Sequence, residues 1–247
     1  RRSFAIALDM IVQAAEPESN KTSIDLSAQI HPSACLNDGI VIGSGSVIDA
    51  GAVIQRGVLI GANCYIGANS VLSHCSIASH VVIGANTVIG ESGFGFEMTN
   101  DGAIRLPHVG IVRIADGCCI GNQCSIDQGS LGDTVLGRSV MIDNMCHIAH
   151  NVQIGDRSIM AAQCGISGTV VIGADVKIGG QVGIAQHVTI GDGAVLTARS
   201  GVTKDVAPNT QMAGFPAVEA GQHWRQSAAL RRLSKLSRAP RNSTETK

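Results

Sequence analysis

The chain has 247 residues, a formal net charge of −1, 45% hydrophobic residues and only 2% aromatic residues. This near-neutral balance gives no reason to expect nucleic-acid binding, and the sequence contains no run of 18 or more apolar residues that would span a membrane. Thirty glycines beside so few large rings argue against an ordinary globular core and favour a narrow, repetitive interior.

The first part of the chain differs from the rest. We expect residues 4–15 to form a short amphipathic helix, and residues 16–21 to form a linker with Pro17 near its start. We treat residues 1–22 as one segment that precedes the repeats.

A six-residue repeat occupies residues 23–207. Each unit begins with an aliphatic residue, often followed by Gly, and has a small residue at its fifth position, as in residues 42–47 and 172–177. We count 27 units, of which 21 begin with Ile. Their first residues are Ile24, Ile30, Leu36, Ile42, Ile48, Ile54, Ile60, Ile66, Leu72, Ile77, Ile83, Ile89, Ile114, Ile120, Ile126, Leu136, Ile142, Ile148, Ile154, Met160, Ile166, Ile172, Ile178, Ile184, Ile190, Leu196 and Val202.

A unit of six residues has room for one short strand and one tight turn, so three units close a coil of 18 residues. The aliphatic residue points inward and stacks on its equivalent one coil away, at the usual strand spacing of about 4.8 Å. The repeat therefore predicts an all-β solenoid, a parallel β-helix. The small fifth position also faces inward and holds five of the eight cysteines, which we interpret as core residues and not as disulfides or metal ligands: Cys64, Cys118, Cys124, Cys146 and Cys164.

Two interruptions break the repeat, one at residues 91–113 and a shorter one at residues 131–135. Beyond the repeat, residues 208–247 are expected to form a turn, a helix at 222–237 and a disordered tail after Arg238. Residues 222–247 carry seven Lys or Arg and one acid. This charge indicates either a solvated helix face or a docking surface for an acidic partner, built from Arg225, Arg231, Arg232 and Lys235.

Two histidines stand out by their phase in the repeat. His150 and His187 lie in units that begin 36 residues apart, so they project from one side of the coil about 9–10 Å apart along its axis. Gly168 lies one coil above His150 and leaves room for a substrate beside a free backbone N–H. A base, an open site and an oxyanion donor are the parts that acyl transfer needs. Asp143 could orient the His150 imidazole, across a corner or from a neighbouring subunit.

Several motifs resemble those of the UDP-3-O-(3-hydroxyacyl)glucosamine N-acyltransferases of lipid A biosynthesis, a hexapeptide-repeat family. They cover roughly residues 24–236 and comprise residues 93–96, 126–130, 142–151, 178–187 and 214–217. The resemblance implies that the β-helix is left-handed, which periodicity alone does not give, because parallel crossovers are almost always right-handed. It implies that His150 is the general base assisted by Asp143, and that Gly168 supplies the oxyanion N–H.

The same resemblance implies further contacts and partners. His187 and Asn144 would contact the substrate, and the loop with Phe94 and Phe96 would border a groove between subunits. The expected enzyme is a cytoplasmic homotrimer without cofactor or metal, which takes a 3-hydroxyacyl chain from acyl carrier protein and places it on UDP-3-O-acylglucosamine. Residues 1–22 would be the remnant of an N-terminal uridine-binding domain.

Some positions depart from the family pattern. Gln186 stands where the family usually has Gly, and Gly201 stands where some members have a bulky Met in the acyl groove, so the sequence leaves the acyl length open. Three other functions remain as alternatives. One is another hexapeptide acyltransferase, acting on a hydroxyl or using acetyl-CoA. The second is a zinc lyase of the γ-carbonic anhydrase type, disfavoured because zinc needs ligand nitrogens at about 2.0–2.1 Å, and so closely converging ligands. The third is a non-catalytic homologue.

Overall fold

The computed structural model describes residues 21–100, 102–214 and 217–236. The helix expected at residues 4–15 and the tail expected after Arg238 lie outside these residues. The chain divides into two compact units, Arg1–Gly214 and Phe215–Lys247.

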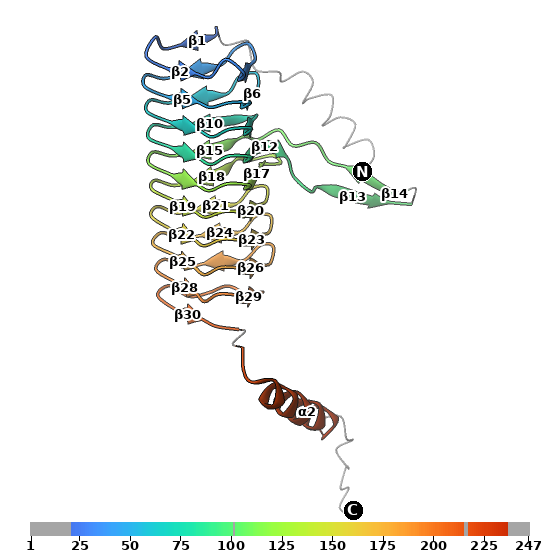
Figure 1. Ribbon diagram of the computed structural model, residues 1–247. Helices are drawn as coiled ribbons and strands as arrows, with labels where there is room; N and C mark the ends of the chain where they lie inside the picture. The colour runs from blue at the N-terminus through green and yellow to red at the C-terminus, as the bar shows by residue number, and fades with distance from the viewer. Residues whose placement is uncertain (1–20, 101, 215–216, 237–247) are drawn as a thin grey trace, which may run out of the picture. The chain divides into compact units, whose positions relative to one another are not determined.

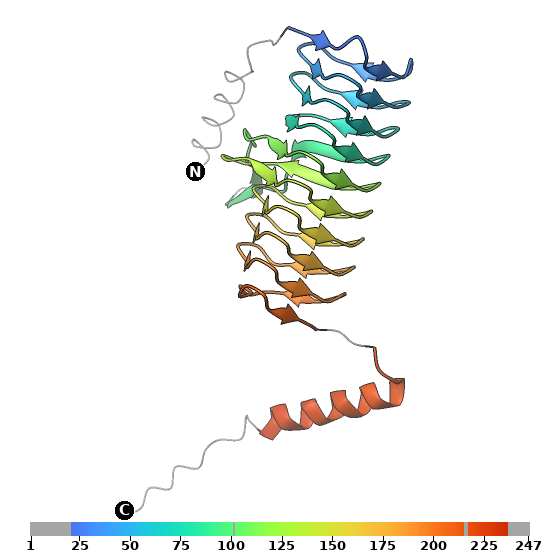
Figure 2. The ribbon, with the colours of Figure 1, turned by 90° about the vertical axis from the view of Figure 1, so that its left-hand side faces the viewer.

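The first unit contains three long parallel sheets, which form the three sides of a coil (Figure 1, Figure 2). The first sheet consists of β1 (Ser23–Ile24), β4 (Val41–Ile42), β7 (Leu59–Ile60), β10 (Cys75–Ile77), β15 (Val112–Ile114), β18 (Thr134–Leu136), β21 (Gln153–Ile154), β24 (Val171–Ile172) and β27 (Thr189–Ile190). The second consists of β2 (Gln29–Ile30), β5 (Val47–Ile48), β8 (Tyr65–Ile66), β11 (Val82–Ile83), β16 (Cys119–Ile120), β19 (Met141–Ile142), β22 (Ile159–Met160), β25 (Lys177–Ile178), β28 (Val195–Leu196) and β30 (Gln211–Met212). The third consists of β3 (Cys35–Leu36), β6 (Val53–Ile54), β9 (Val71–Leu72), β12 (Val88–Ser92), β17 (Ser125–Gln128), β20 (His147–Ile148), β23 (Gly165–Ile166), β26 (Gly183–Ile184) and β29 (Gly201–Val202).

Every one of the 27 predicted unit starts lies in one of these strands. Strands one coil apart pair in parallel, so Ile42 lies opposite Ile60 and Ile148 opposite Ile166. The predicted solenoid of three-sided, 18-residue coils is therefore confirmed.

The interior of the coil is a continuous stack of aliphatic side chains. Ile48, Ile54, Ile66 and Ile148 are completely buried. The five cysteines assigned to the small inward position are at most 2% exposed, and all eight cysteines are free thiols. The interpretation of those five as core residues is confirmed.

At most turns of the coil one residue has left-handed backbone. At the corner between the third and first sheets this position is held in successive coils by Asn151, Thr169 and His187, whose φ angles are 61°, 62° and 63°. The residue just before it in each coil, His150, Gly168 or Gln186, lies on the same corner. Two columns of residues thus follow this edge of the prism, one with His150, Gly168 and Gln186 and the other with Asn151, Thr169 and His187.

Both interruptions of the repeat emerge at this same corner. The first follows β12 and contains a hairpin of β13 (Phe96–Thr99) and β14 (Gly102–Arg105), which projects from the stack in Figure 1. The second follows β17 and precedes β18. The insertions therefore surround one edge of the prism and leave the other two corners regular.

The stack ends later than residue 207, the boundary that the repeat predicted. Val206 bridges to Ile190, and β30 pairs with β28 with Met212 opposite Leu196. These partners are 16 residues apart instead of 18, so the last coil is two residues short. The six-residue pattern is lost there although the coil continues.

The second unit contains helix α2 (Ala220–Leu236), which agrees with the helix predicted at residues 222–237. Glu219 caps its start by accepting hydrogen bonds from the backbone N–H groups of Gly221 and Gln222. Arg225, Arg231 and Arg232 are exposed, and the side chain of Lys235 lies outside the described part. Across the residues described, we find no helix with the length and apolar character to span a membrane.

Candidate functional site

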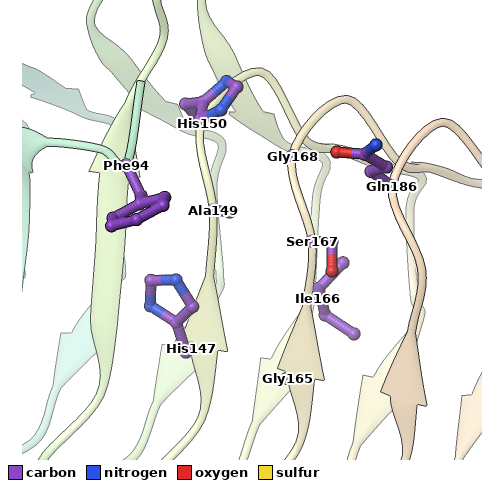
Figure 3. Close-up of a pocket in the computed structure, with 9 residues that line it drawn as sticks. All are labelled: Phe94, His147, Ala149, His150, Gly165, Ile166, Ser167, Gly168 and Gln186. Carbon is purple, nitrogen blue, oxygen red and sulfur yellow. The ribbon is translucent and has the colours of Figure 1, made fainter. Parts of the chain in front are cut away.

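A pocket lies on the third sheet beside the corner that carries the insertions. Figure 3 shows His147 and His150 on one side of it and the strand and turn of the next coil on the other. The residues that line it are Phe94, His147, Ala149, His150, Gly165, Ile166, Ser167, Gly168 and Gln186. The predicted residues His150, Gly168 and Phe94 are thus brought together.

The His150 ring lies directly against the backbone of Gly168. A Cβ atom added to Gly168 would lie 2.7 Å from Cε1 and 2.8 Å from Nε2 of His150. Any other residue at position 168 would displace the ring, so the close approach requires glycine. This contact also shows that the Nε2 edge of His150 faces Gly168.

Asn151 fixes which nitrogen of His150 carries the proton. Its side-chain Nδ2 donates to the Gly132 carbonyl at 2.8 Å, and its Oδ1 accepts from the Ser130 backbone N–H at 3.0 Å. The same Oδ1 lies 3.0 Å from His150 Nδ1. Because the two backbone groups determine the orientation of the amide, Nδ1 must be the donor, and Nε2 is left with a free lone pair.

The backbone N–H of Gly168 is available as a donor. At several turns of the other two corners, the N–H in this position is capped by a side chain from the next coil, such as Ser79 on Ala62, Asn122 on Ala85 and Asp192 on Ala174. Within the described part of the chain, no such cap reaches Gly168. A free N–H beside a basic nitrogen is the arrangement expected of an oxyanion donor next to a general base.

The loop after β12 closes one side of the pocket. A Cβ atom on Gly93 would lie 3.1 Å from His150 Cβ and 3.1 Å from Asp127 Oδ2, so this loop packs tightly on both residues. Phe94 is 86% exposed, and its ring contacts that of Phe96 edge-on at 4.8 Å between centroids. An aromatic side chain so exposed at a pocket is suited to contact a ligand or another subunit.

Asp143 and Asn144 lie away from His150 within one chain. They follow β19, at the corner between the second and third sheets, whereas His150 follows β20 at the next corner. The Asp143 carboxylate accepts from the backbone and side-chain amides of Asn144, at 2.8 and 2.6 Å. Among the described residues, the partner of His150 Nδ1 is Asn151 and not Asp143.

His187 lies on the same edge of the prism as His150, two coils further on. Its Nδ1 is hydrogen-bonded to the Thr169 hydroxyl. The residue that occupies the His150 position two coils later is Gln186, and Gln186 is the one that lines the pocket. His187 is thus one residue displaced from the column that contains His150.

Four further polar residues at or beside the pocket were not predicted as site residues. Asp127 is 7% exposed, and its Oδ2 lies 3.7 Å from Nε2 of His147. Burial raises the pKa of Asp127, an effect that His147 and then His150 oppose. His108, 5% exposed, contacts the His150 ring edge-on at 5.3 Å between centroids. His108 lies in the first interruption of the repeat, and Asn151 is held by Ser130 and Gly132 between β17 and β18, so an analysis of unit phases passes over both.

The chemistry of the site is that of a positioned base beside a backbone donor. No group of three or more His, Cys, Asp or Glu side chains gathers as a metal site within residues 21–100, 102–214 and 217–236. His150 and Gly168 could take a proton from a nucleophile and stabilise a developing oxyanion.

Similar proteins of known name share the repeat region. The chain is 52% identical over 157 residues to a UDP-3-O-acylglucosamine N-acyltransferase of Maricaulis maris (strain MCS10), a match that covers 64% of this chain and 44% of that protein. It is 53% identical over 146 residues to the protein of the same name from Chlorobium luteolum (strain DSM 273 / BCRC 81028 / 2530), covering 58% of this chain and 42% of that protein. The chain thus spans less than half the length of these relatives.

Solved structures support the fold. A UDP-N-acetylglucosamine acyltransferase from Campylobacter jejuni superimposes with a TM-score of 0.68 at 23% identity, over 82% of this chain and 83% of that one. The UDP-N-acetylglucosamine acyltransferase of Francisella novicida gives a TM-score of 0.63 at 22% identity, over 83% and 73% of the two chains. At this identity the likeness concerns the fold.

The repeat itself matches a defined family. The family described as "Bacterial transferase hexapeptide (six repeats)" matches residues 39–74, 57–92, 133–168 and 169–204, which together make up about half of the chain. The coil is accordingly a left-handed parallel β-helix. With its 18-residue coils and its inward aliphatic stack, the chain belongs to the bacterial hexapeptide-repeat transferases.

Proposed function

We propose that this chain carries the catalytic β-helix of a UDP-3-O-acylglucosamine N-acyltransferase that acts in the cytoplasm. The reaction would move a 3-hydroxyacyl chain from acyl carrier protein to the 2-amino group of UDP-3-O-acylglucosamine. The name of the relatives at 52% and 53% identity supports N-acyl transfer and this acceptor. The observation that carries the proposal is the free lone pair of His150 Nε2 facing Gly168, in a pocket open to solvent.

The first step forms the new C–N bond. The neutral amine attacks the thioester carbonyl carbon while His150 Nε2 removes a proton from the nitrogen. The carbonyl oxygen becomes an oxyanion, which the Gly168 N–H stabilises. Asn151 Oδ1 keeps its hydrogen bond to Nδ1–H, so the resulting imidazolium stays in place.

The second step breaks the C–S bond. The oxyanion collapses to a carbonyl, and the thiolate of the carrier's prosthetic arm leaves. The imidazolium of His150 returns its proton to that sulfur. The products are the amide and the free carrier thiol, and His150 is again neutral.

Other residues would contribute when subunits assemble or when a partner binds. In a homotrimer, the corner that carries Asp143 and Asn144 of one subunit would meet the groove of the next, where Asp143 would assist His150 and Asn144 would contact the substrate. His187 would contact the acceptor, and Phe94 and Phe96 would border the groove. The exposed Arg225, Arg231 and Arg232 of α2 would attract the acidic carrier protein together with Lys235, and salt would weaken this attraction.

Replacement of the base tests the proposal. His150→Ala should lower kcat by about 10²- to 10⁴-fold, because general-base catalysis typically contributes that much. The assay is steady-state transfer from a carrier-linked donor to UDP-3-O-acylglucosamine, with an acceptor that bears a hydroxyl in place of the amine measured beside it. Preference for the hydroxyl acceptor would instead favour an O-acyltransferase.

The exposed His31, on the first coils, provides the matched control. His31→Ala should retain full activity, and both variants should melt near the wild-type temperature. A folded His150→Ala variant with near wild-type kcat would contradict the mechanism.

A further inference from the structure

The outer face of the third sheet has a lane without side chains. Gly165, Gly183 and Gly201 lie in register on consecutive coils, directly beyond His147. A Cβ atom added to any of the three glycines would meet nothing within 4 Å. Three strand spacings make this lane roughly 14 Å long from His147 to Gly201. An unbranched apolar chain could lie along it.

His147 is the last polar side chain before this lane. It lines the same pocket as His150 and Gly168, and its side chain is 52% exposed. Figure 3 shows His147 and His150 along one edge of the pocket, with Gly165 and Gly168 on the neighbouring strand and turn. A chain that starts between His150 and Gly168 and continues over the glycines must therefore pass His147.

Asp127 lies behind His147 and is unusual for its position. Equivalent positions in the next three coils are Ala149, Ser167 and Ala185, so the coil itself does not require a carboxylate there. Asp127 is 7% exposed, and within the described part of the chain its nearest polar partner is His147 Nε2, at 3.7 Å. A nearly buried carboxylate without a hydrogen-bond donor destabilises the fold. A role in holding His147 explains why it is there.

The orientation of His147 follows from this pair. Nε2 lies 3.7 Å from the carboxylate oxygen, an electrostatic contact and not a hydrogen bond, so the other ring nitrogen, Nδ1, is the one that can meet a ligand. A polar ring nitrogen at the head of an apolar lane matches a chain that is polar near its carbonyl and apolar beyond. A hydroxyl group is the natural complement, because it can donate to a neutral imidazole nitrogen or accept from a protonated one.

We propose that His147, positioned by Asp127, binds a hydroxyl group on the first carbons of the acyl chain and makes the site selective for hydroxylated donors. This inference rests on the proposed acyl transfer and names a specificity determinant within it. His147 would contact the donor directly, and Asp127 would be a positioning residue. The remainder of the chain would lie over Gly165, Gly183 and Gly201.

The test compares two carrier-linked donors of equal length, one with a 3-hydroxyl group and one without. The ratio of their kcat/KM values is measured, so that losses common to both donors cancel. We expect the wild type to prefer the hydroxylated donor about tenfold, the effect of one hydrogen bond of roughly 1.4 kcal/mol. His147→Ala should bring the ratio close to one, Asp127→Asn should lower it in part, and His147→Gln should restore part of it because the amide oxygen can accept.

His31→Ala serves again as the control and should leave the ratio unchanged. A ratio that His147→Ala does not alter would overturn the proposal. Should the wild type transfer neither donor, the proposed function would fail. Calorimetric binding of the two acyl-pantetheines to the wild type and His147→Ala would then decide the hydroxyl site separately. Equal affinities of the wild type for both would overturn it.

Discussion

The His150 ring depends on one amide for its orientation. Asn151 Oδ1 accepts from His150 Nδ1 and from Ser130, and Nδ2 donates to Gly132. We expect Asn151→Ala to lower kcat roughly 10- to 100-fold, less than loss of the base itself, with little change in KM. Asn151→Asp should retain more activity because a carboxylate still accepts from Nδ1. Steady-state kinetics of both variants would check this, and an unchanged kcat in Asn151→Ala would contradict it.

His108 should make the fold sensitive to mild acid. Its Nδ1 donates to the Leu106 carbonyl at 3.2 Å, and its buried Nε2 has no partner in the described part of the chain. Burial and then the neighbouring His150 lower the pKa of His108 from 6.5, while the Leu106 carbonyl opposes them. Below about pH 6.5 the unfolded chain therefore binds more protons at this position than the folded chain, so stability falls as the pH falls.

The expected result is a smaller decrease in Tm between pH 7.5 and pH 5.5 for His108→Gln than for the wild type, because glutamine does not titrate. Thermal melting at the two pH values measures it, with His31→Ala as an exposed-histidine control that keeps the wild-type decrease. Identical decreases in wild type and His108→Gln would show that His108 does not contribute.

Sequence spacing could find the residues of this site that belong to regular coils. His150 and Gly168 are 18 residues apart, and that distance alone predicts that they are neighbours. Asn151 could not be assigned its role in this way, because its partners Ser130 and Gly132 lie between β17 and β18, where the repeat is interrupted. Spacing could not find His108 either, because it lies in the first insertion. The Asp143 carboxylate was expected near His150, but within one chain it binds Asn144 at another corner.

At the scale of strands and turns, the six-residue period of the sequence predicts the positions of almost all strands of the coil. A two-residue strand has one inward side chain, so a run of aliphatic residues every six positions fixes the register of each strand. The strands of the hairpin, β13 and β14, pair with each other and not with the stack. Their residues therefore do not have to follow the six-residue period, and the period does not predict them. The shortened last coil could not be recognised either, since the loss of two residues shifts Val206 and Met212 out of phase.

The glycine lane of the third sheet should set the length of the acyl chain. Gly201 is its outermost glycine, paired with Gly183 on β26. Gly201→Met would place a flexible apolar side chain across the lane. We expect kcat/KM to fall about tenfold for chains that extend past this position, and to be unchanged for shorter ones, since a blocked contact is worth roughly 1–3 kcal/mol. A series of carrier-linked donors of increasing length measures the effect.

Thr189→Met is the matched control, because Thr189 is exposed on the first sheet and lies outside the lane. It should leave the length profile unchanged. A profile that is the same for Gly201→Met and the wild type would show that the chain follows another path.

At the scale of the whole molecule, the second sheet has an apolar outer face. Its outward residues on consecutive coils are Val47, Tyr65, Val82, Cys119, Met141 and Ile159, and the column ends at Lys177. Met141 and Ile159 are 42% and 45% exposed in the single chain. A continuous apolar column whose side chains are partly exposed among the described residues is suited to contact with further copies of the chain.

We therefore expect a homotrimer in which this face is buried. Ile159→Arg, alone or with Met141→Arg, would place a charge in the contact, where an unpaired buried charge costs several kcal/mol, and should shift the protein towards monomers. Light scattering at micromolar concentration measures the change, with Thr189→Arg on the first sheet as a control that remains trimeric. Activity should fall together with assembly, because Asp143 and Asn144 would act on the pocket of a neighbouring subunit. A wild-type monomer with full activity would contradict both the assembly and this assignment of Asp143.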